Sequence, residues 1–404
     1  MPDEKFNKTQ LHVGATAFVS LFSLVGIMFY GLPFFYDFWI KDFGWSRATI
    51  TSGGAFGKVV IGLLFGFIAG WLIDRLGPRR LMLTGIVMGG MALVGLSLMT
   101  SLWQFYLFYL LNALGYLFGG PLPNQVLISR WFNAARGKVM GIAYLGIGVG
   151  GMLVPQIAKA LNVEFGWRGG LLGLGVIMIA VALPMAWFVK ENPDAAAVAT
   201  KTGSPKVSFT KILTSRIFYL LLIGSVCSIA AVAGTSQNLK LFLSIDLKYT
   251  QQEAANVLTI LLGASIIGRL FMGWLADKIQ KRYVMILIYS LVAISIPLLY
   301  AAETKGVMYL FAIIFGVALG GDYMIIPLMA AELFGVKVMG RVMGIIISVD
   351  GLGEAFAPML AGALRDRMGS YTYGFLSLII LAVIGTIAIT FLPKSKYNES
   401  KKIM

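Results

Sequence analysis

The sequence has 404 residues, of which 58% are hydrophobic and only 13% are charged. Soluble domains carry roughly 45–50% apolar and about 25% charged residues, so this composition excludes a soluble protein of this size. The single cysteine and the single histidine, Cys227 and His12, exclude a disulfide framework and a multi-histidine metal centre, and no cofactor is expected. The net charge of +15 does not indicate nucleic acid as a partner, because the basic residues stand in short loops between apolar runs.

Twelve apolar runs follow one another along the chain, each long enough to cross a bilayer as a helix of roughly 20 residues. They cover residues 13–39, 48–73, 81–100, 103–129, 139–163, 169–189, 216–240, 254–276, 283–302, 306–332, 342–364 and 373–393. The predicted fold class is an all-α membrane protein with twelve transmembrane helices in two six-helix bundles, embedded in the lipid bilayer.

The longest polar stretch, at 190–215, is rich in Ala, Thr, Ser, Pro and Lys and is predicted to be a cytoplasmic linker. It divides the chain into an N-terminal six-helix bundle, 1–189, and a C-terminal six-helix bundle, 216–404. Of the 33 Lys and Arg residues, 22 fall on one side of the predicted spans and 9 on the other. The positive-inside rule then places both termini in the cytoplasm and the protein in the cell (inner) membrane, as a multi-pass protein.

Two loops show that the halves are repeats of one another. The segment Gly70-Trp-Leu-Ile-Asp74 returns as Gly273-Trp-Leu-Ala-Asp277, at an offset of 203 residues. The loops that begin at Gly137 and Gly340, and the prolines Pro155 and Pro358, keep the same offset. Three matches in one register indicate two similar halves that run parallel in the membrane.

The G-x-x-x-D-R-x-G-x-R-R pattern at 70–80, its weaker second copy and the repeat resemble the major facilitator superfamily over nearly the whole chain. The resemblance implies an alternating-access transporter with a monomeric transport unit, which is not an enzyme. It also implies a cytoplasmic gate, in which Asp74 pairs with Arg136 or Lys138 and Asp277 pairs with Lys337 or Arg341. The residues assigned to this gate are Asp74, Arg75, Arg136, Lys138, Asp277, Lys337 and Arg341.

The stretch 130–151 is similar to the fifth-helix motif of monocarboxylate porters, with aromatic, basic and then small residues. The segment 42–47, Asp-Phe-Gly-Trp-Ser-Arg, is typical of the bacterial branch that also holds oxalate–formate exchangers. This resemblance implies that a small monocarboxylate, such as L-lactate or a pyruvate-like acid, is carried together with a proton. An exchanger without proton coupling and a non-transporting membrane receptor on the same scaffold remain the alternatives.

Arg269 lies in the inner half of the eighth apolar run, and a guanidinium group grips a carboxylate through two parallel hydrogen bonds. Ser265, one turn earlier, shares its helix face. Monocarboxylate porters carry an Arg here that receives the substrate carboxylate, and an Asp four positions before it; because Ser265 replaces that Asp, the proton site must lie elsewhere. Lys58, in the second run, is either a substrate contact or part of a structural ion pair.

Three acids at membrane depth are the candidates for proton coupling: Asp322, then Glu354, and Asp350. An apolar setting favours the neutral form of a carboxyl group, which allows it to carry a proton. The alternative for each acid is a structural pairing with Lys58 or Arg269. Asp350 stands where oxalate exchangers have a second cation, so the resemblance favours a monoanion over a dianion.

Uncharged polar residues in the apolar runs are candidates for the lining of a substrate cavity. Asn112 and Tyr116 share a helix face, and Tyr30 stands beside the Gly31–Pro33 interruption of the first run. The full set is Tyr30, Asn112, Tyr116, Gln125, Tyr144, Gln237, Asn238 and Tyr323.

Overall fold

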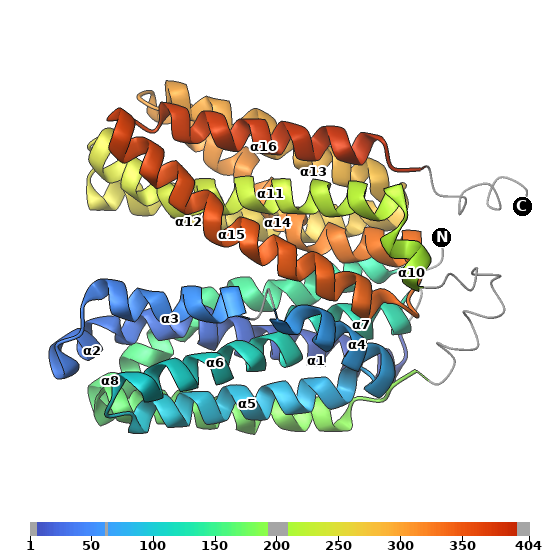
Figure 1. Cartoon of the computed structure of the whole chain (residues 1–404), viewed down its shortest axis with the longest axis horizontal. Helices are drawn as coiled ribbons and strands as arrows, with labels where there is room; N and C mark the ends of the chain where they lie inside the picture. The colour runs from blue at the N-terminus through green and yellow to red at the C-terminus, as the bar shows by residue number, and fades with distance from the viewer. Residues whose placement is uncertain (1–5, 61–63, 193–208, 394–404) are drawn as a thin grey trace, which may run out of the picture. The chain divides into compact units, whose positions relative to one another are not determined.

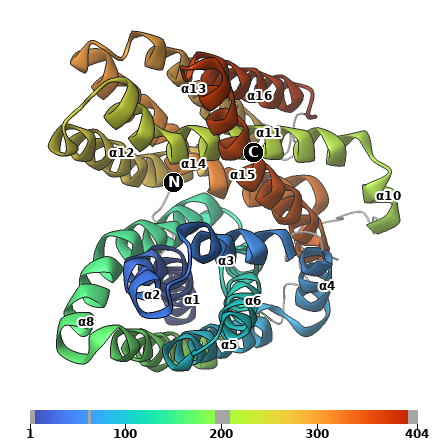
Figure 2. The ribbon, with the colours of Figure 1, turned by 60° about the vertical axis from the view of Figure 1, so that its left-hand side comes forward.

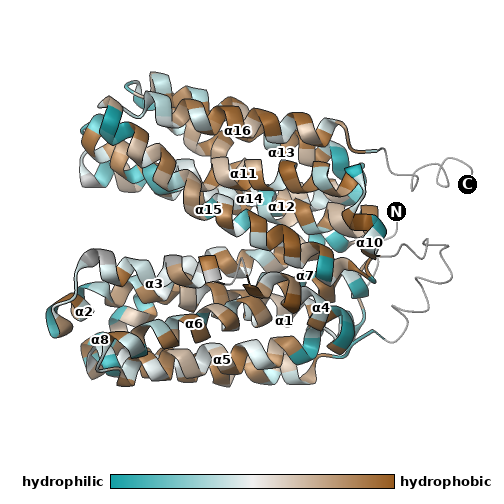
Figure 3. Ribbon diagram, viewed as in Figure 1, coloured by the Kyte–Doolittle hydropathy of each residue, from teal (hydrophilic) through white to brown (hydrophobic). Residues whose placement is uncertain are grey.

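The computed structural model describes residues 6–60, 64–192 and 209–393 and shows helices without strands in these ranges (Figure 1). Most of the predicted linker, 193–208, lies outside the described residues. Figure 3 shows hydrophobic residues along the helices and the most hydrophilic ones at helix ends and in connections, which is the pattern that a bilayer selects.

The first half of the chain supplies six spans, several of them built from consecutive helical pieces. Their bounds are α1 (Lys8–Leu21), the π-helix η1 (Phe22–Gly31), the 3-10 helix η2 (Leu32–Phe35), α2 (Tyr36–Phe43), α3 (Arg47–Val60), α4 (Gly66–Leu76), α5 (Pro78–Leu98), α6 (Leu102–Gly119), α7 (Pro121–Trp131) and α8 (Arg136–Phe188). The change of winding in the first span falls at the predicted Gly31–Pro33 interruption, because proline cannot donate a backbone hydrogen bond.

The second half supplies the other six spans. Their bounds, with the short helix that precedes them, are α10 (Phe209–Leu213), α11 (Arg216–Leu241), the π-helix η4 (Phe242–Asp246), α12 (Gln251–Lys278), α13 (Lys281–Ser295), the 3-10 helix η5 (Ile296–Ala301), α14 (Lys305–Phe334), α15 (Met339–Met368) and α16 (Thr372–Thr390).

Ten helical segments in the described ranges are long and apolar enough to cross a membrane. One of them, α8, holds two spans, since the backbone of Gly166 (φ 67°) turns the chain between them. The helices α3 and α4, on either side of residues 61–63 that lie outside the described ranges, correspond to the predicted run 48–73. The twelve predicted spans are therefore accounted for.

The chain forms two compact units, in each of which the helices gather into a bundle (Figure 2). The first comprises Met1–Asn133, Ile142–Gly203 and Val336–Ser348, and the second comprises Ala134–Gly141, Ser204–Gly335 and Val349–Met404. Each of the long helices α8 and α15 thus begins in one unit and continues in the other.

Small residues allow helices of the second unit to pack backbone against backbone. The helices α12 and α14 are in extensive contact, and a Cβ atom on Gly320 would meet the carbonyl oxygen of Ser265 at 2.2 Å. A Cβ on Gly268 would meet the carbonyl oxygen of Val317 at the same distance. Close approach of this kind stabilises helix pairs in lipid, where the hydrophobic effect does not drive helices together. It fixes α12, which carries Arg269, against α14, which carries Asp322.

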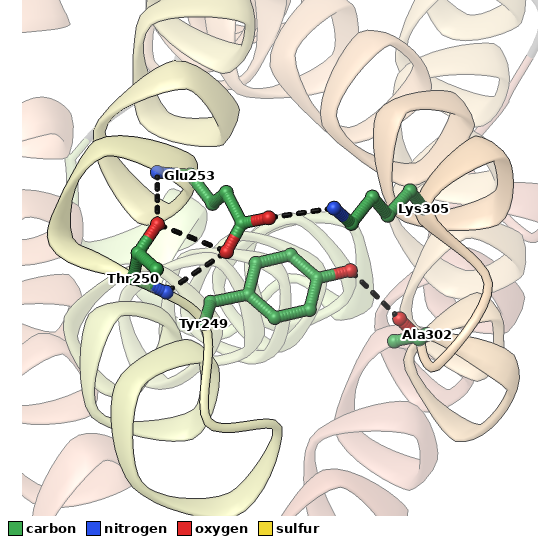
Figure 4. A network of polar contacts seen from close by, with 5 residues as sticks. All are labelled: Tyr249, Thr250, Glu253, Ala302 and Lys305. Carbon is green, nitrogen blue, oxygen red and sulfur yellow. Dashed lines mark hydrogen bonds and ion pairs between the residues drawn. The ribbon is translucent and has the colours of Figure 1, made fainter.

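A polar network joins the start of α12 to the connection between η5 and α14 (Figure 4). Glu253 accepts a hydrogen bond of 2.9 Å from the backbone amide of Thr250, whose hydroxyl caps the helix in return. Lys305 donates to the same carboxylate at 2.6 Å, and the Tyr249 hydroxyl donates to the carbonyl of Ala302 at 3.1 Å. Because the ion pair is exposed, its role is to fix the helix start rather than to add much stability.

The repeat recurs at the level of single contacts. The guanidinium group of Arg79 donates to the carbonyl of Trp187, and that of Arg282 donates to the carbonyl of Thr390. Both donors and both acceptors differ by 203 residues, so the two halves hold their third and sixth helices together in the same way.

Candidate functional site

Arg269 is half-buried on α12, and its guanidinium group donates a hydrogen bond of 2.8 Å to the hydroxyl of Ser265. That hydroxyl donates in turn to the carbonyl of Leu262 at 2.7 Å. Ser265 is 1% exposed, so its position is fixed by packing. The serine therefore holds one nitrogen of the guanidinium group and orients the planar fork, which is the arrangement that suits recognition of a carboxylate.

Asp322 and Asp350 are buried in the second unit, and each accepts a hydrogen bond from a serine of α11. The Ser228 hydroxyl lies 2.9 Å from Asp322 Oδ1. The Ser225 hydroxyl lies 2.7 Å from both carboxyl oxygens of Asp350. No lysine or arginine in the described ranges forms an ion pair with either acid, so the alternative that they are structural partners of Arg269 is wrong.

Glu354 lies one turn after Asp350 on α15 and is half-buried. The hydroxyl of Tyr323 donates to its carboxyl group at 3.2 Å, so the structure brings together two residues that the sequence analysis selected separately. The side chain of Lys58, the other predicted cation, lies outside the described residues. No group of three or more His, Cys, Asp or Glu in the described part of the chain could hold a metal ion.

The predicted lining residues of the first unit have different surroundings. Asn112 is buried and its side-chain oxygen has no hydrogen-bond partner among the described residues, whereas Tyr30 is 39% exposed and packs near Gly151. Tyr116, one turn from Asn112, is half-buried. The side-chain oxygen of Gln125 is also buried without a described partner, so both amides remain ligand-contact candidates of this unit.

Four further lining candidates divide into bonded and exposed side chains. Gln125 donates to the hydroxyl of Tyr144, and Asn238 donates to the carbonyl of Pro358 at 3.1 Å. Gln237 is exposed. The bonded pairs join one helix to another, which is the commonest use of polar groups in membrane helices.

Each of the two repeated aspartates binds the start of a helix that belongs to the other copy of the repeat. Asp277 accepts hydrogen bonds of 2.7 Å from the backbone amides of Gly137 and Lys138. Asp74 accepts from the amides of Gly340 (2.9 Å) and Arg341 (3.2 Å). Carboxylates in this position satisfy free amides and interact favourably with the helix dipole.

The predicted gate pairings are therefore wrong. Asp74 pairs with Arg341, whose Nε lies 2.9 Å from its carboxylate, and not with Arg136 or Lys138. Asp277 bonds to the helix that begins at Arg136, and not to Lys337 or Arg341. The physical reason is that each aspartate faces the helix start of the other copy, whose backbone amides offer two donors, and Arg341 belongs to the helix start that Asp74 faces.

The remaining gate residues lie at the periphery. Arg75 and Lys337 are exposed, and the guanidinium carbon of Arg75 lies 5.2 Å from the centre of the Trp71 ring. A hollow of about 610 Å³ lies beside Asp74 in the first unit. Its polar lining consists of Asp74, Arg75, Arg79, Arg80, Arg130 and Glu191.

The sequence matches the family described as Major Facilitator Superfamily over residues 16–255 and 222–403, which together span nearly the whole described chain. The chain belongs to the major facilitator superfamily. It is a multi-pass membrane protein with the helical architecture of a secondary transporter, and no enzyme activity is indicated by this membership.

Three relatives of this facilitator differ in what their names state. Monocarboxylate transporter 13 of Rattus norvegicus is 24% identical, over 80% of this chain and 75% of its own length. The probable hexose phosphate transport protein of Chlamydia muridarum is also 24% identical, over 92% and 90%. The membrane sensor protein UhpC of Salmonella typhimurium is 26% identical, over 90% and 89%. Because the three relatives are similarly distant in sequence, their sequence identities do not decide which substrate class this chain binds.

Solved structures resemble this facilitator in fold. The fucose:proton symporter FucP of E. coli superimposes with a TM-score of 0.73 over 96% of this chain and 98% of its own, at 16% sequence identity. The similarity extends to the fold alone.

The sequence analysis missed three polar residues around the two buried aspartates: Ser225 and Ser228, which bond them, and Tyr289 of α13, which is fully buried near both. Serine is common in membrane helices, and a serine that bonds its own helix looks the same in sequence as one that bonds a carboxylate. The only available signal was the i, i+3 spacing of Ser225 and Ser228, which places both hydroxyls on one face of α11.

Proposed function

We propose that this facilitator carries small monocarboxylates, L-lactate or a pyruvate-like acid, across the cell (inner) membrane by proton symport with alternating access. The observation that carries the proposal is Arg269, half-buried on α12 and held by Ser265 at 2.8 Å. An arginine keeps its charge at any working pH, and its guanidinium fork neutralises and orients one carboxylate.

The substrate proposal follows from the charge at membrane depth. Among the 33 basic residues, only Lys58 and Arg269 lie well inside the apolar runs rather than near their ends, and three acidic residues, Asp322, Asp350 and Glu354, lie there too. A phosphate ester carries about two negative charges and needs more cations than a monocarboxylate does. The monocarboxylate transporter among the relatives supports this choice, and the hexose phosphate protein names the competing substrate class.

The proposed roles follow the two repeats. Contacts with the substrate are assigned to Arg269, Ser265 and Tyr323 in the second unit, and to Tyr30, Lys58, Asn112 and Tyr116 in the first. The proton is assigned to the carboxyl groups of Asp322, Asp350 and Glu354. With both termini in the cytoplasm, the helix starts that Asp74 and Asp277 bind form the cytoplasmic gate. We retain 1–189 and 216–404 as the two transport domains and 190–215 as their linker.

Uptake of labelled L-lactate into vesicles that contain the purified protein tests the proposal. Uptake should be faster at about pH 5.5 outside than at about pH 7.5, and a protonophore should abolish the accumulation. Unlabelled pyruvate should compete, whereas a hexose phosphate should not. Failure of every small monocarboxylate to be taken up would refute the substrate class.

Two other functions predict different results in the same vesicles. An anion exchanger of the oxalate–formate kind would show uptake that depends on internal monocarboxylate and ignores the pH gradient. A receptor would bind its ligand without counterflow, and the similarity to a membrane sensor protein favours keeping this second candidate. Counterflow separates it from both transport mechanisms, because only a transporter releases its ligand on the other side.

A further inference from the structure

The two buried aspartates of the second unit lie close enough for their charges to interact, although they stand on different helices. Asp322 is 0% exposed on α14, and Asp350 is 8% exposed on α15. The carboxyl group of Asp350 interacts electrostatically with that of Asp322 and also with that of Glu354. Both are held from the same side, by the hydroxyls of Ser228 and Ser225 on α11.

Two polar atoms at this place are fully buried and have no hydrogen-bond partner in the part of the chain that the structure describes. One is Oδ2 of Asp322, and the other is the hydroxyl of Tyr289 on α13. Tyr289 is 0% exposed, and its hydroxyl is within electrostatic range of both Asp322 and Asp350. A buried polar group without a partner calls for an explanation, and an exchangeable proton on the neighbouring carboxyl group is one that fits both atoms.

The repeat shows that the fold does not need these polar groups. The residues that stand 203 positions before Ser225, Ser228, Tyr289, Asp322 and Asp350 are Phe22, Val25, Ile86, Gly119 and Ile147. All five are apolar or glycine, and they build the corresponding helices of the first unit. Buried carboxyl groups cost stability, so their presence in only one copy of the repeat points to a function of the second unit.

Charged and titratable groups lie on all five helices that carry the two acids or pack against α14. They are Cys227 on α11, Arg269 on α12, Tyr289 on α13, Tyr323 on α14 and Glu354 on α15, the last two bonded to each other. No lysine or arginine of the described ranges neutralises either aspartate. Two adjacent carboxylates in such surroundings cannot both be ionised, because each disfavours the charge of the other.

We propose that Asp322 and Asp350 form a single proton-binding pair, which exchanges one proton in each transport cycle and retains the other. This inference rests on the proposed proton symport and narrows it, since it excludes Glu354 as the carrier. In the loaded pair both carboxyl groups are acids. On release one O–H bond breaks, the proton passes to water, and the pair keeps one proton and one negative charge.

The surrounding hydroxyls have a defined part in this step. A serine O–H can donate to only one acceptor at a time, so Ser225 and Ser228 each stabilise the carboxylate that they contact. The unpartnered hydroxyl of Tyr289 supplies a further donor when the pair becomes negative. Ser225, Ser228 and Tyr289 are therefore positioning residues, which set the pH at which the pair loses its proton.

Infrared spectroscopy of the purified full-length protein tests the pair without any substrate. The absorption of protonated carboxyl groups is compared between about pH 5 and about pH 9. The wild type should lose a signal that corresponds to one proton. Asp322→Asn and Asp350→Asn should each keep a titrating signal, because one carboxyl group remains, and the double variant should lose it. Glu354→Gln should keep it.

Three results would overturn the proposal. Loss of the signal in one single variant would assign the proton to that aspartate alone. Its persistence in the double variant would place the proton elsewhere, and its absence from the wild type would mean that the pair does not exchange a proton. None of these results depends on lactate, so failure of the pair and failure of the proposed substrate are distinguished.

Variants of the serines test the positioning role in vesicles. Ser225→Ala and Ser228→Ala each remove a donor to a carboxylate, so the pH of half-maximal uptake should rise by about one unit. Ser295→Ala is the matched control, because this buried serine of α13 bonds only the carbonyl of Val292 in its own helix, at 2.9 Å. An unchanged pH profile in both test variants, or an equal shift in the control, would refute the role.

Discussion

Asp277 of α12 accepts a hydrogen bond of 2.7 Å from the backbone amide of Gly137, at the start of α8. Its repeat partner, Asp74, accepts one of 2.9 Å from the amide of Gly340, at the start of α15. All four residues obey the offset of 203. The repeated loop thus acts as a helix cap that each copy of the repeat supplies to the other, and not as a set of salt bridges within one copy.

The cap predicts a loss of stability when its acceptor is removed. Asp277→Ala and Asp74→Ala should each destabilise the protein by about 1 kcal/mol, because two amides at a helix start lose their partner. Thermal unfolding in detergent measures the effect. Asp366→Ala is the control, since that side chain is 78% exposed, and it should leave the unfolding temperature unchanged. Equal unfolding temperatures for all three variants would contradict the cap.

The backbones of α8 and α12 approach closely beside the Asp277 cap, so a larger side chain at this contact should disturb the packing of the two helices. A Cβ atom on Gly137 would meet the carbonyl oxygen of Gly273 at 2.3 Å, so Gly137→Ala should force α8 away from α12. Transport and thermal stability should both fall. Gly263→Ala, also on α12, meets nothing within 4 Å and should behave as the wild type in both assays. A Gly137→Ala protein that transports normally would show that the helices separate without cost.

The gate illustrates what the sequence predicts and what it does not. Apolar runs of about 20 residues predict the spans because an unsatisfied backbone in lipid is too costly, and the repeat register follows from three matched segments. Which copy of a repeated loop faces which helix start does not follow, because Asp74 and Asp277 have nearly the same local sequence. The packing of α4 and α12 decides it, through glycines whose neighbours the sequence does not name.

Substrate binding should strictly require the guanidinium group of Arg269. Arg269→Lys keeps the positive charge but loses the planar fork, so substrate affinity should fall by roughly 10- to 100-fold, the equivalent of one charge-assisted hydrogen bond. Arg269→Ala should abolish uptake at normal expression. Binding of labelled L-lactate to purified protein separates the loss of affinity from misfolding. If Arg269→Lys bound L-lactate with wild-type affinity, Arg269 would not be a substrate contact.

Removal of the Ser265 hydroxyl should have a smaller effect on substrate binding than replacement of Arg269. Ser265→Ala removes the 2.8 Å hydrogen bond that orients the guanidinium group, so KM should rise about five- to tenfold with little change in the maximal rate. Uptake measured over a range of lactate concentrations gives both constants. Ser295→Ala is the matched control, because this buried serine also bonds the carbonyl three residues before it but contacts no guanidinium group, and an equal rise in its KM would assign the effect to packing.

The candidate site was predictable for residues that share one helix and unpredictable for those that meet across helices. The i, i+4 spacing places Ser265 beside Arg269, and it is sufficient by itself. The partners of Asp322 and Asp350 come from α11, about 95 to 125 residues away in sequence, and nothing local marks Ser225 or Ser228 as different from other serines. That Asp322 and Asp350 are buried without a neighbouring lysine or arginine likewise depends on how the helices pack, which the local sequence does not show.

The most direct test of proton symport measures lactate efflux and proton movement together in vesicles of purified protein. With an outward-directed lactate gradient and no imposed pH gradient, lactate efflux should carry protons with it, and an external pH indicator should report acidification. Arg269→Ala should abolish both signals. The double variant Asp322→Asn/Asp350→Asn should lose the acidification while it still exchanges labelled for unlabelled lactate. Lactate efflux by the wild type without any proton movement would contradict proton symport by this facilitator.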